Sequence, residues 1–172
     1  MATIAIKQLY MYDVRTKEEA ERDIRRGNER AKQVMKRFKQ YLTKKYGEEP
    51  VIEENGCEAG YEDCIIDPRR VTEEPDYRVN GHLVEVKTAV GIPKTIWLKK
   101  SQVDKLADKG GHILFAMGDF REGNVFFTLI DNSKLKEIAE TARVTYPAAY
   151  GYMKACYEVS RNQFVWDYLP NN

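Results

Sequence analysis

Apolar residues recur at helical spacing through the first third of the chain. One face of the predicted helix carries Ala31, Val34, Met35, Phe38, Leu42 and Tyr46. Thr16 with Glu19 three residues later is a capping-box pattern, and Gly47 follows the last apolar position. We therefore expect helix over residues 16–46, divided in two if Gly27 and Asn28 break it. The preceding residues 3–14 alternate loosely and predict an opening strand.

Near residue 80 the pattern changes to that of β-strands. Residues 76–79 and 82–88 are strand-like runs separated by Asn80-Gly81, a strong signal for a two-residue hairpin. Downstream we expect a helix capped by Ser101 and running through Lys109, strands over 112–117 and 125–130, a helix over 135–142, and a final hairpin of 156–159 with 164–168. Residues 48–74 are acidic and predict loop with one or two strands.

The hairpin register brings candidate chemistry together. A two-residue turn pairs Tyr77 with Val84 and, one step further, Asp76 with Glu85. Two carboxylates paired in this way lie about 4.5–5.5 Å apart at Cβ and repel each other unless a positive charge relieves them. Side chains alternate along a strand, so Lys87 shares the face of Glu85. The sequence therefore predicts two acids and a lysine on one patch.

Two interpretations of this patch are open. The same register places Glu74 opposite Lys87, which would make the lysine part of a surface ion pair. That interpretation leaves the repulsion between Asp76 and Glu85 unrelieved, and a divalent cation would relieve it. Mg²⁺ prefers hard oxygen ligands, and Asp76, Glu85 and the main-chain carbonyl of Val86 would supply them, with Mn²⁺ as a substitute. Such a site suits phosphodiester hydrolysis.

Pro75-Asp76, an eight-residue gap and Glu85-Val86-Lys87 together resemble the motif of the PD-(D/E)XK nuclease superfamily. The resemblance covers about residues 20–130, and Holliday junction resolvases and phage nucleases are the groups considered within it. It implies an α/β fold with a central mixed β-sheet flanked by helices, a restriction-endonuclease-like core. It also implies DNA as the substrate, endonuclease rather than exonuclease action, metal held by Asp76 and Glu85, and a water assisted by Lys87.

The resemblance extends to residues outside the motif. Many members carry a further metal-directed glutamate on the first helix, and Glu29 is similar in position. On a continuous helix, however, Glu29 would point away from the apolar face, as a surface acid does. Beyond the hairpin, the candidates for contact with the DNA backbone are Lys94, Lys99, Lys100, Gln102 and Lys105. Each has the alternative role of a solvated residue on an amphipathic helix or its flanks.

Composition and charge set the context for these candidates. The chain has 172 residues, 42% hydrophobic and 32% charged, and a formal net charge of +1, which is typical of one globular domain. The balance hides a basic block over residues 14–46 and an acidic block over 48–76, which suits a polyanion-binding face beside a cation-binding pocket. A solvated basic helix beside an acidic loop gives the same pattern.

The remaining sequence features concern location and alternative sites. No apolar run approaches bilayer length and no export signal is evident at the N-terminus, so we expect a cytoplasmic protein without a membrane partner. Three cysteines predict free thiols, and a zinc site of Cys57, Cys64 and His82 is disfavoured by its spacing. His112 begins an apolar run and is expected to pack.

The sequence thus predicts one domain over residues 1–172, with a C-terminal hairpin extension, that acts as a Mg²⁺-dependent DNA nuclease. Two alternatives remain. One is a junction resolvase, for which a homodimer would place two sites on two strands. The other is a noncatalytic nucleic-acid-binding protein that keeps the fold.

Overall fold

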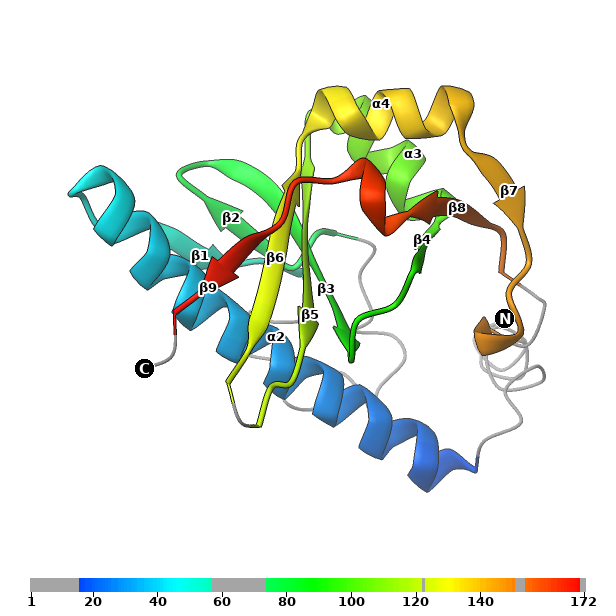
Figure 1. The fold of residues 1–172 in the computed structure, drawn as a ribbon, viewed down its shortest axis with the longest axis horizontal. Helices are drawn as coiled ribbons and strands as arrows, with labels where there is room; N and C mark the ends of the chain where they lie inside the picture. Colours follow the sequence, from blue (N-terminus) through cyan, green and yellow to red (C-terminus); the bar gives the residue numbers. More distant parts are fainter. Residues whose placement is uncertain (1–15, 57–73, 122, 151–153, 171–172) are drawn as a thin grey trace, which may run out of the picture.

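The computed structural model describes residues 16–56, 74–121, 123–150 and 154–170 (Figure 1). Its helices and strands, with η for 3₁₀-helices, are α2 (Lys17–Tyr46), β1 (Ile52–Glu54), β2 (Tyr77–Val79), β3 (His82–Val90), β4 (Thr95–Lys99), α3 (Lys100–Lys109), β5 (His112–Gly118), β6 (Val125–Ile130), α4 (Asn132–Thr141), β7 (Arg143–Thr145), η4 (Ala148–Tyr150), β8 (Cys156–Ser160), η5 (Arg161–Gln163) and β9 (Asp167–Leu169).

A mixed six-stranded sheet in the order β1-β2-β3-β5-β6-β9 forms the centre of the molecule. Only β3 and β5 pair in parallel, since β4 and α3 carry the chain across between them, and the other neighbours are antiparallel. A second sheet has the order β4-β8-β7. Figure 1 shows α2 crossing one face of the large sheet, with α3, α4 and the small sheet on the other. The predicted α/β class with a helix-flanked mixed sheet is confirmed.

Alternation along β3 divides its side chains between two cores. Val84 and Val86 are buried in the cluster that α2 covers. The next strand follows the same rule, because Ile113 and Phe115 of β5 belong to the cluster under α3 and α4. Glu85 and Lys87 pair with Ile113 and Phe115 in register, so they lie on the α3 side of the sheet.

The long helix α2 follows its predicted pattern closely. Thr16 and Glu19 form the reciprocal capping box, and Gly47 ends the helix at φ 76°. Gly27 does not divide the helix. The apolar face is buried from Ala31 to Phe38, but Tyr46 in the last turn is 67% exposed, because the sheet no longer lies beneath it.

The predicted C-terminal hairpin is wrong. β8 pairs with β4 and β7 in the small sheet, whereas β9 pairs with β6 at the edge of the large one. Ser160 caps the short η5 helix, and the Trp166 Nε1 donates to the carbonyl of Arg161 at 3.0 Å, so that the chain leaves one sheet and enters the other. β8 lies close to the predicted residues 156–159, but β9 covers only Asp167–Leu169, and the two strands do not pair with each other.

The predicted start of α3 is also wrong. Ser101 does not cap the helix, which begins at Lys100 after Lys99 with no side-chain cap. The N–H of Lys100 instead donates to the carbonyl of Ala155 at 2.9 Å, so a tertiary contact satisfies a donor that a cap would otherwise take. The opening strand and the cysteines Cys57 and Cys64 lie outside the described residues. Cys156 is a buried free thiol.

Within the described ranges, no helix combines the length and apolar character needed to cross a membrane.

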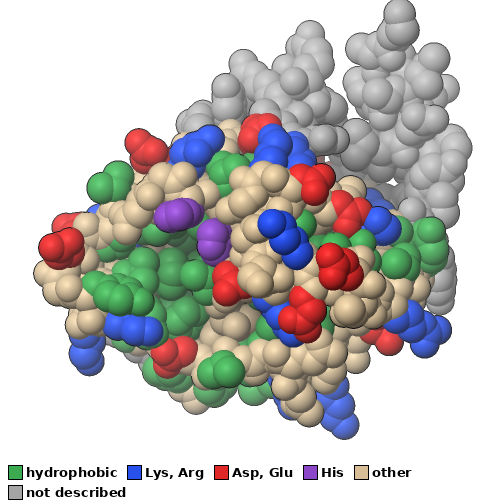
Figure 2. Space-filling view, turned by 90° about the horizontal axis from the view of Figure 1, so that it is seen from above, with side chains coloured by type: hydrophobic (Ala, Val, Ile, Leu, Met, Phe, Trp, Pro, Cys, Tyr) green, Lys and Arg blue, Asp and Glu red, His purple; other side chains and the backbone are tan. Residues whose placement is uncertain are grey.

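The two histidines lie side by side on the surface, as Figure 2 shows, with ring centroids 5.6 Å apart. Burial and the neighbouring His82 lower the pKa of His112, although Asp131 and a main-chain bond at Leu83 oppose them. The fold therefore favours the neutral ring, while the unfolded chain binds a proton near pH 6.5. His112 contributes stability above about pH 6.5 that is lost as the pH falls below that value.

We expect the urea midpoint of the wild type to be lower at pH 5.5 than at pH 7.5. The decrease should be smaller in His112→Phe. Urea denaturation at both pH values checks this. An equal fall in both proteins would assign the acid sensitivity to other groups.

Candidate active site

The β2–β3 hairpin positions the acidic residues as its turn dictates. Asn80 and Gly81 both have positive φ, 48° and 82°, and the pairs Val79 with His82 and Tyr77 with Val84 follow. Asp76 lies one residue before β2, outside the ladder rather than within it as predicted. Its Oδ2 accepts a hydrogen bond from the N–H of Val86 at 2.9 Å. The Asp76 side chain thus replaces a main-chain acceptor for Val86 beyond the end of β2.

Glu85 is the most buried charged residue of the site, with 7% of its surface exposed. Its Oε1 accepts from Lys87 Nζ at 2.5 Å and from Gln102 Nε2 at 2.9 Å. Burial by itself lowers the pKa of Lys87, but the charge and hydrogen bond of Glu85, together with the charge of Asp76, raise it above its ordinary value. Lys87 is therefore held as a cation against the carboxylates.

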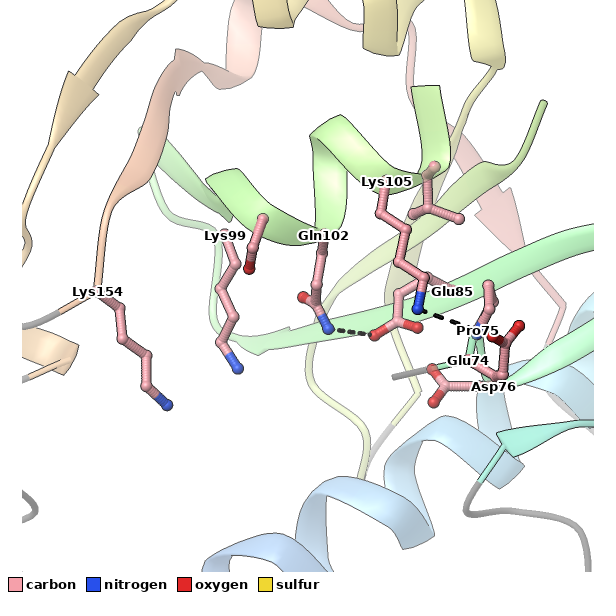
Figure 3. A pocket seen from close by; sticks show the side chains of 10 residues that line it. Glu74, Pro75, Asp76, Glu85, Lys99, Gln102, Lys105 and Lys154 are labelled. Carbon is pink, nitrogen blue, oxygen red and sulfur yellow. Dashed lines mark hydrogen bonds and ion pairs between the residues drawn. The ribbon is translucent and has the colours of Figure 1, made fainter. Parts of the chain in front are cut away.

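A pocket of about 430 Å³ opens over this group. The side chains that line it and carry charge or an amide are Glu74, Asp76, Glu85, Lys99, Gln102, Lys105 and Lys154. Figure 3 shows Asp76 and Glu74 toward one end, Glu85 and Gln102 in the middle, and Lys99 and Lys154 toward the other. The pocket thus has an acidic end, where Lys105 lies near Glu74, and a basic end.

Helix α3 supplies the upper wall of the pocket. Lys99 directly precedes the helix, and Gln102 and Lys105 follow at intervals of three, which places all three on one face. Val103 and Leu106 on the neighbouring face are buried in the core. Their burial fixes the orientation of the helix, with Gln102 and Lys105 lining the pocket. The Gln102 Oε1 is buried and has no hydrogen-bond partner among the described residues, so it could accept from a water or a ligand.

Several predicted site residues lie elsewhere. Glu29 is exposed on α2, which packs on the sheet face opposite to Glu85. Lys94 is exposed before β4. Lys100 turns away from the pocket to bond Asp104 at 2.5 Å and lies over the Tyr157 ring. The structure therefore brings together Asp76, Glu85, Lys87, Lys99 and Gln102, but not these three.

The proposed ion pair of Glu74 with Lys87 does not form. Glu74 instead accepts a hydrogen bond from Lys109 at 3.3 Å and lies 3.8 Å from Lys105, while Lys87 donates to Glu85. Because Lys87 bonds Glu85 directly, it relieves part of the repulsion that the sequence interpretation left to a cation alone. Glu74 and Lys154 were missed as pocket residues, whereas Lys105 is one of the lysines predicted to contact the DNA backbone. No local signal in the sequence places Lys154.

The donor set fits a hard cation such as Mg²⁺ in part. Both hydrogen bonds that Lys87 and Gln102 donate to Glu85 end on Oε1, so within the described part of the chain Oε2 can serve as a ligand atom. Since the N–H and C=O of one strand residue point to the same side, the Val86 carbonyl projects toward Asp76, as its N–H does. Among the described residues, no three or more His, Cys, Asp or Glu side chains are placed so that together they could hold a metal ion. Two carboxylates suit Mg²⁺, which keeps several of its waters.

The chain matches no protein-family model, and no curated protein matches it in sequence. Its function must therefore be argued from the pocket.

Proposed function

We propose that the chain is a Mg²⁺-dependent nuclease of the PD-(D/E)XK type that hydrolyses phosphodiester bonds in DNA. The observation that carries the proposal is the placement of Asp76 and Glu85 in one pocket, with Lys87 bonded to Glu85. The Asp76, Glu85 and Lys87 spacing of the motif thus corresponds to adjacent groups in space.

The residues divide the work by their chemistry. Asp76, Glu85 and the Val86 carbonyl would hold the cation, which when bound would polarise the scissile phosphate and acidify a water. Lys87, kept protonated by the two carboxylates, would orient that water and stabilise the negative charge that develops on the phosphate oxygens. Gln102 fixes the rotamer of Glu85 through its hydrogen bond.

One observation favours a second function, that of a noncatalytic nucleic-acid-binding protein. Glu85 is already compensated by Lys87 and Gln102 without a metal. In that case the lysines of the pocket would bind phosphate, and the carboxylates would only hold the lysines in place.

The test is incubation of the purified protein with supercoiled plasmid, linear duplex, single-stranded DNA and a four-way junction in Mg²⁺ or Mn²⁺. We expect cutting that chelation with EDTA stops and that Asp76→Asn lowers at least about 10²-fold, since a metal ligand is lost. The matched control is Asp108→Asn, an exposed acid on α3 outside the pocket, which should cut at the wild-type rate.

Cutting that survives in Asp76→Asn would contradict the assigned site. Binding to DNA without cutting by the wild type in either metal would establish the second function instead. The junction substrate decides whether the enzyme prefers branched DNA.

A further inference from the structure

Two lysines lie in the pocket on the side of Glu85 away from Asp76. Lys99 precedes α3 and Lys154 precedes β8, and Figure 3 shows both side chains extending into the same open region. Among the residues that the structure describes, no carboxylate is in ion-pair contact with either. The neighbouring lysines differ, since Lys100 is paired with Asp104, and Lys105 lies near Glu74.

Lys99 is held among like charges. Its Nζ lies 5.7 Å from the centre of the Tyr150 ring. Burial, Lys87 and Lys154 lower its pKa to about 8, against opposing contributions from Glu85 and Cys156. Like charges gathered in a partly buried place destabilise the fold unless an anion relieves them. Such a cluster inside a pocket is a feature of binding sites for anions.

We propose that Lys99 and Lys154 form a subsite for a second phosphate of a polynucleotide strand, next to the phosphate held over Asp76 and Glu85. The inference rests on the proposed function, and it names the substrate class. The substrate is a strand with at least two consecutive phosphodiesters, lying along the pocket from its acidic to its basic end. A nucleotide ester with a single phosphate leaves the lysines uncompensated and is a poor substrate.

The first test measures binding without metal, so that it does not depend on cutting. A fluorescent single-stranded oligonucleotide is titrated in EDTA over a series of NaCl concentrations, by anisotropy, with the wild type and Lys99→Met/Lys154→Met. Loss of one phosphate contact reduces the slope of log K against log salt by about 0.7–1. The control Lys100→Met removes an adjacent lysine that points away, and its slope should equal that of the wild type.

The second test locates the contact on the substrate. A trinucleotide has two linkages, and either one is replaced by a neutral methylphosphonate. In an NMR titration one of these replacements should weaken binding to the wild type several-fold, yet leave binding to the double variant unchanged, because the contact is already gone. Circular dichroism checks that the variants are folded.

The subsite would be overturned if the methylphosphonate weakened binding equally in the wild type and the double variant. An unchanged slope of log K against log salt would overturn it as well. The two proposals fail separately. If the slope is unchanged while Asp76→Asn abolishes cutting, the nuclease stands and the subsite is wrong. If the methylphosphonate weakens binding to the wild type alone but the wild type never cuts in Mg²⁺, the subsite stands as a phosphate site and the nuclease proposal fails.

Discussion

Replacement of Lys87 by methionine should lower DNA cleavage by about 10²–10⁴-fold, the usual range for loss of a group that orients a water or stabilises developing charge. The same change should lower the free energy of unfolding. Lys87 is 2.5 Å from Glu85, whose side chain is only 9% exposed, so the substitution leaves a nearly buried carboxylate without its cation. With the lysine side chain 31% exposed, solvent screening reduces the expected loss to about 1–3 kcal/mol.

The double variant Lys87→Met/Glu85→Gln separates the two effects. It removes the uncompensated charge, so urea denaturation should show that stability is largely recovered while cleavage stays lost. The matched control is Lys134→Met, which breaks a surface pair with Glu137 and should cost less than about 0.5 kcal/mol without changing cleavage. A Lys87→Met protein that cuts normally would remove Lys87 from the chemistry. A double variant no more stable than the single one would refute the charge argument.

The hairpin of the candidate site was predictable because its geometry is local. Asn80 and Gly81 adopt the positive φ angles that a type I′ turn needs, and the turn then determines the pairing of every residue toward Tyr77 and Val84. Alternation along β3 is local too, and it places the side chains of Glu85 and Lys87 on the opposite face of the sheet from Val84. Only the end of the ladder was misjudged, since Asp76 leaves the strand and its side chain takes the Val86 N–H.

The remainder of the site was hidden because it depends on pairing between distant segments. Lys154 enters the pocket only because β8 pairs with β4, whose end at Lys99 opposes Cys156. Neither β4 nor β7 was predicted, and the strand after Phe164 was paired with the wrong neighbour. Short strands can pair with several partners, and here the segment between β8 and β9 packs Phe164 and Trp166 against the core cluster under α3 and α4. The periodicity of a strand's sequence does not indicate which distant strand it pairs with.

A second large effect is expected at Gly118, where β5 ends. Its φ is +136°, which side chains rarely adopt, and an added Cβ would lie 2.0 Å from the carbonyl oxygen of Asn124. That oxygen also accepts the N–H of Asp119 at 3.1 Å, so the turn between β5 and β6 cannot move aside without losing a hydrogen bond. Gly118→Ala should therefore lower the free energy of unfolding by at least about 2 kcal/mol, from backbone strain and overpacking together.

The control is the same substitution at Gly27, inside α2, where a Cβ would have no atom within 4 Å. Gly27→Ala should stabilise the protein by up to about 1 kcal/mol, because alanine favours the helix. Gly118 pairs with Val90, whereas Glu85 pairs with Ile113 at the other end of the same two strands. The Gly118→Ala protein should therefore cut DNA at the wild-type rate at temperatures where urea denaturation finds it folded. Lost cutting in the folded variant would show that this end of the sheet also positions the carboxylates, whereas equal stability of the two alanine variants would contradict the strain at Gly118.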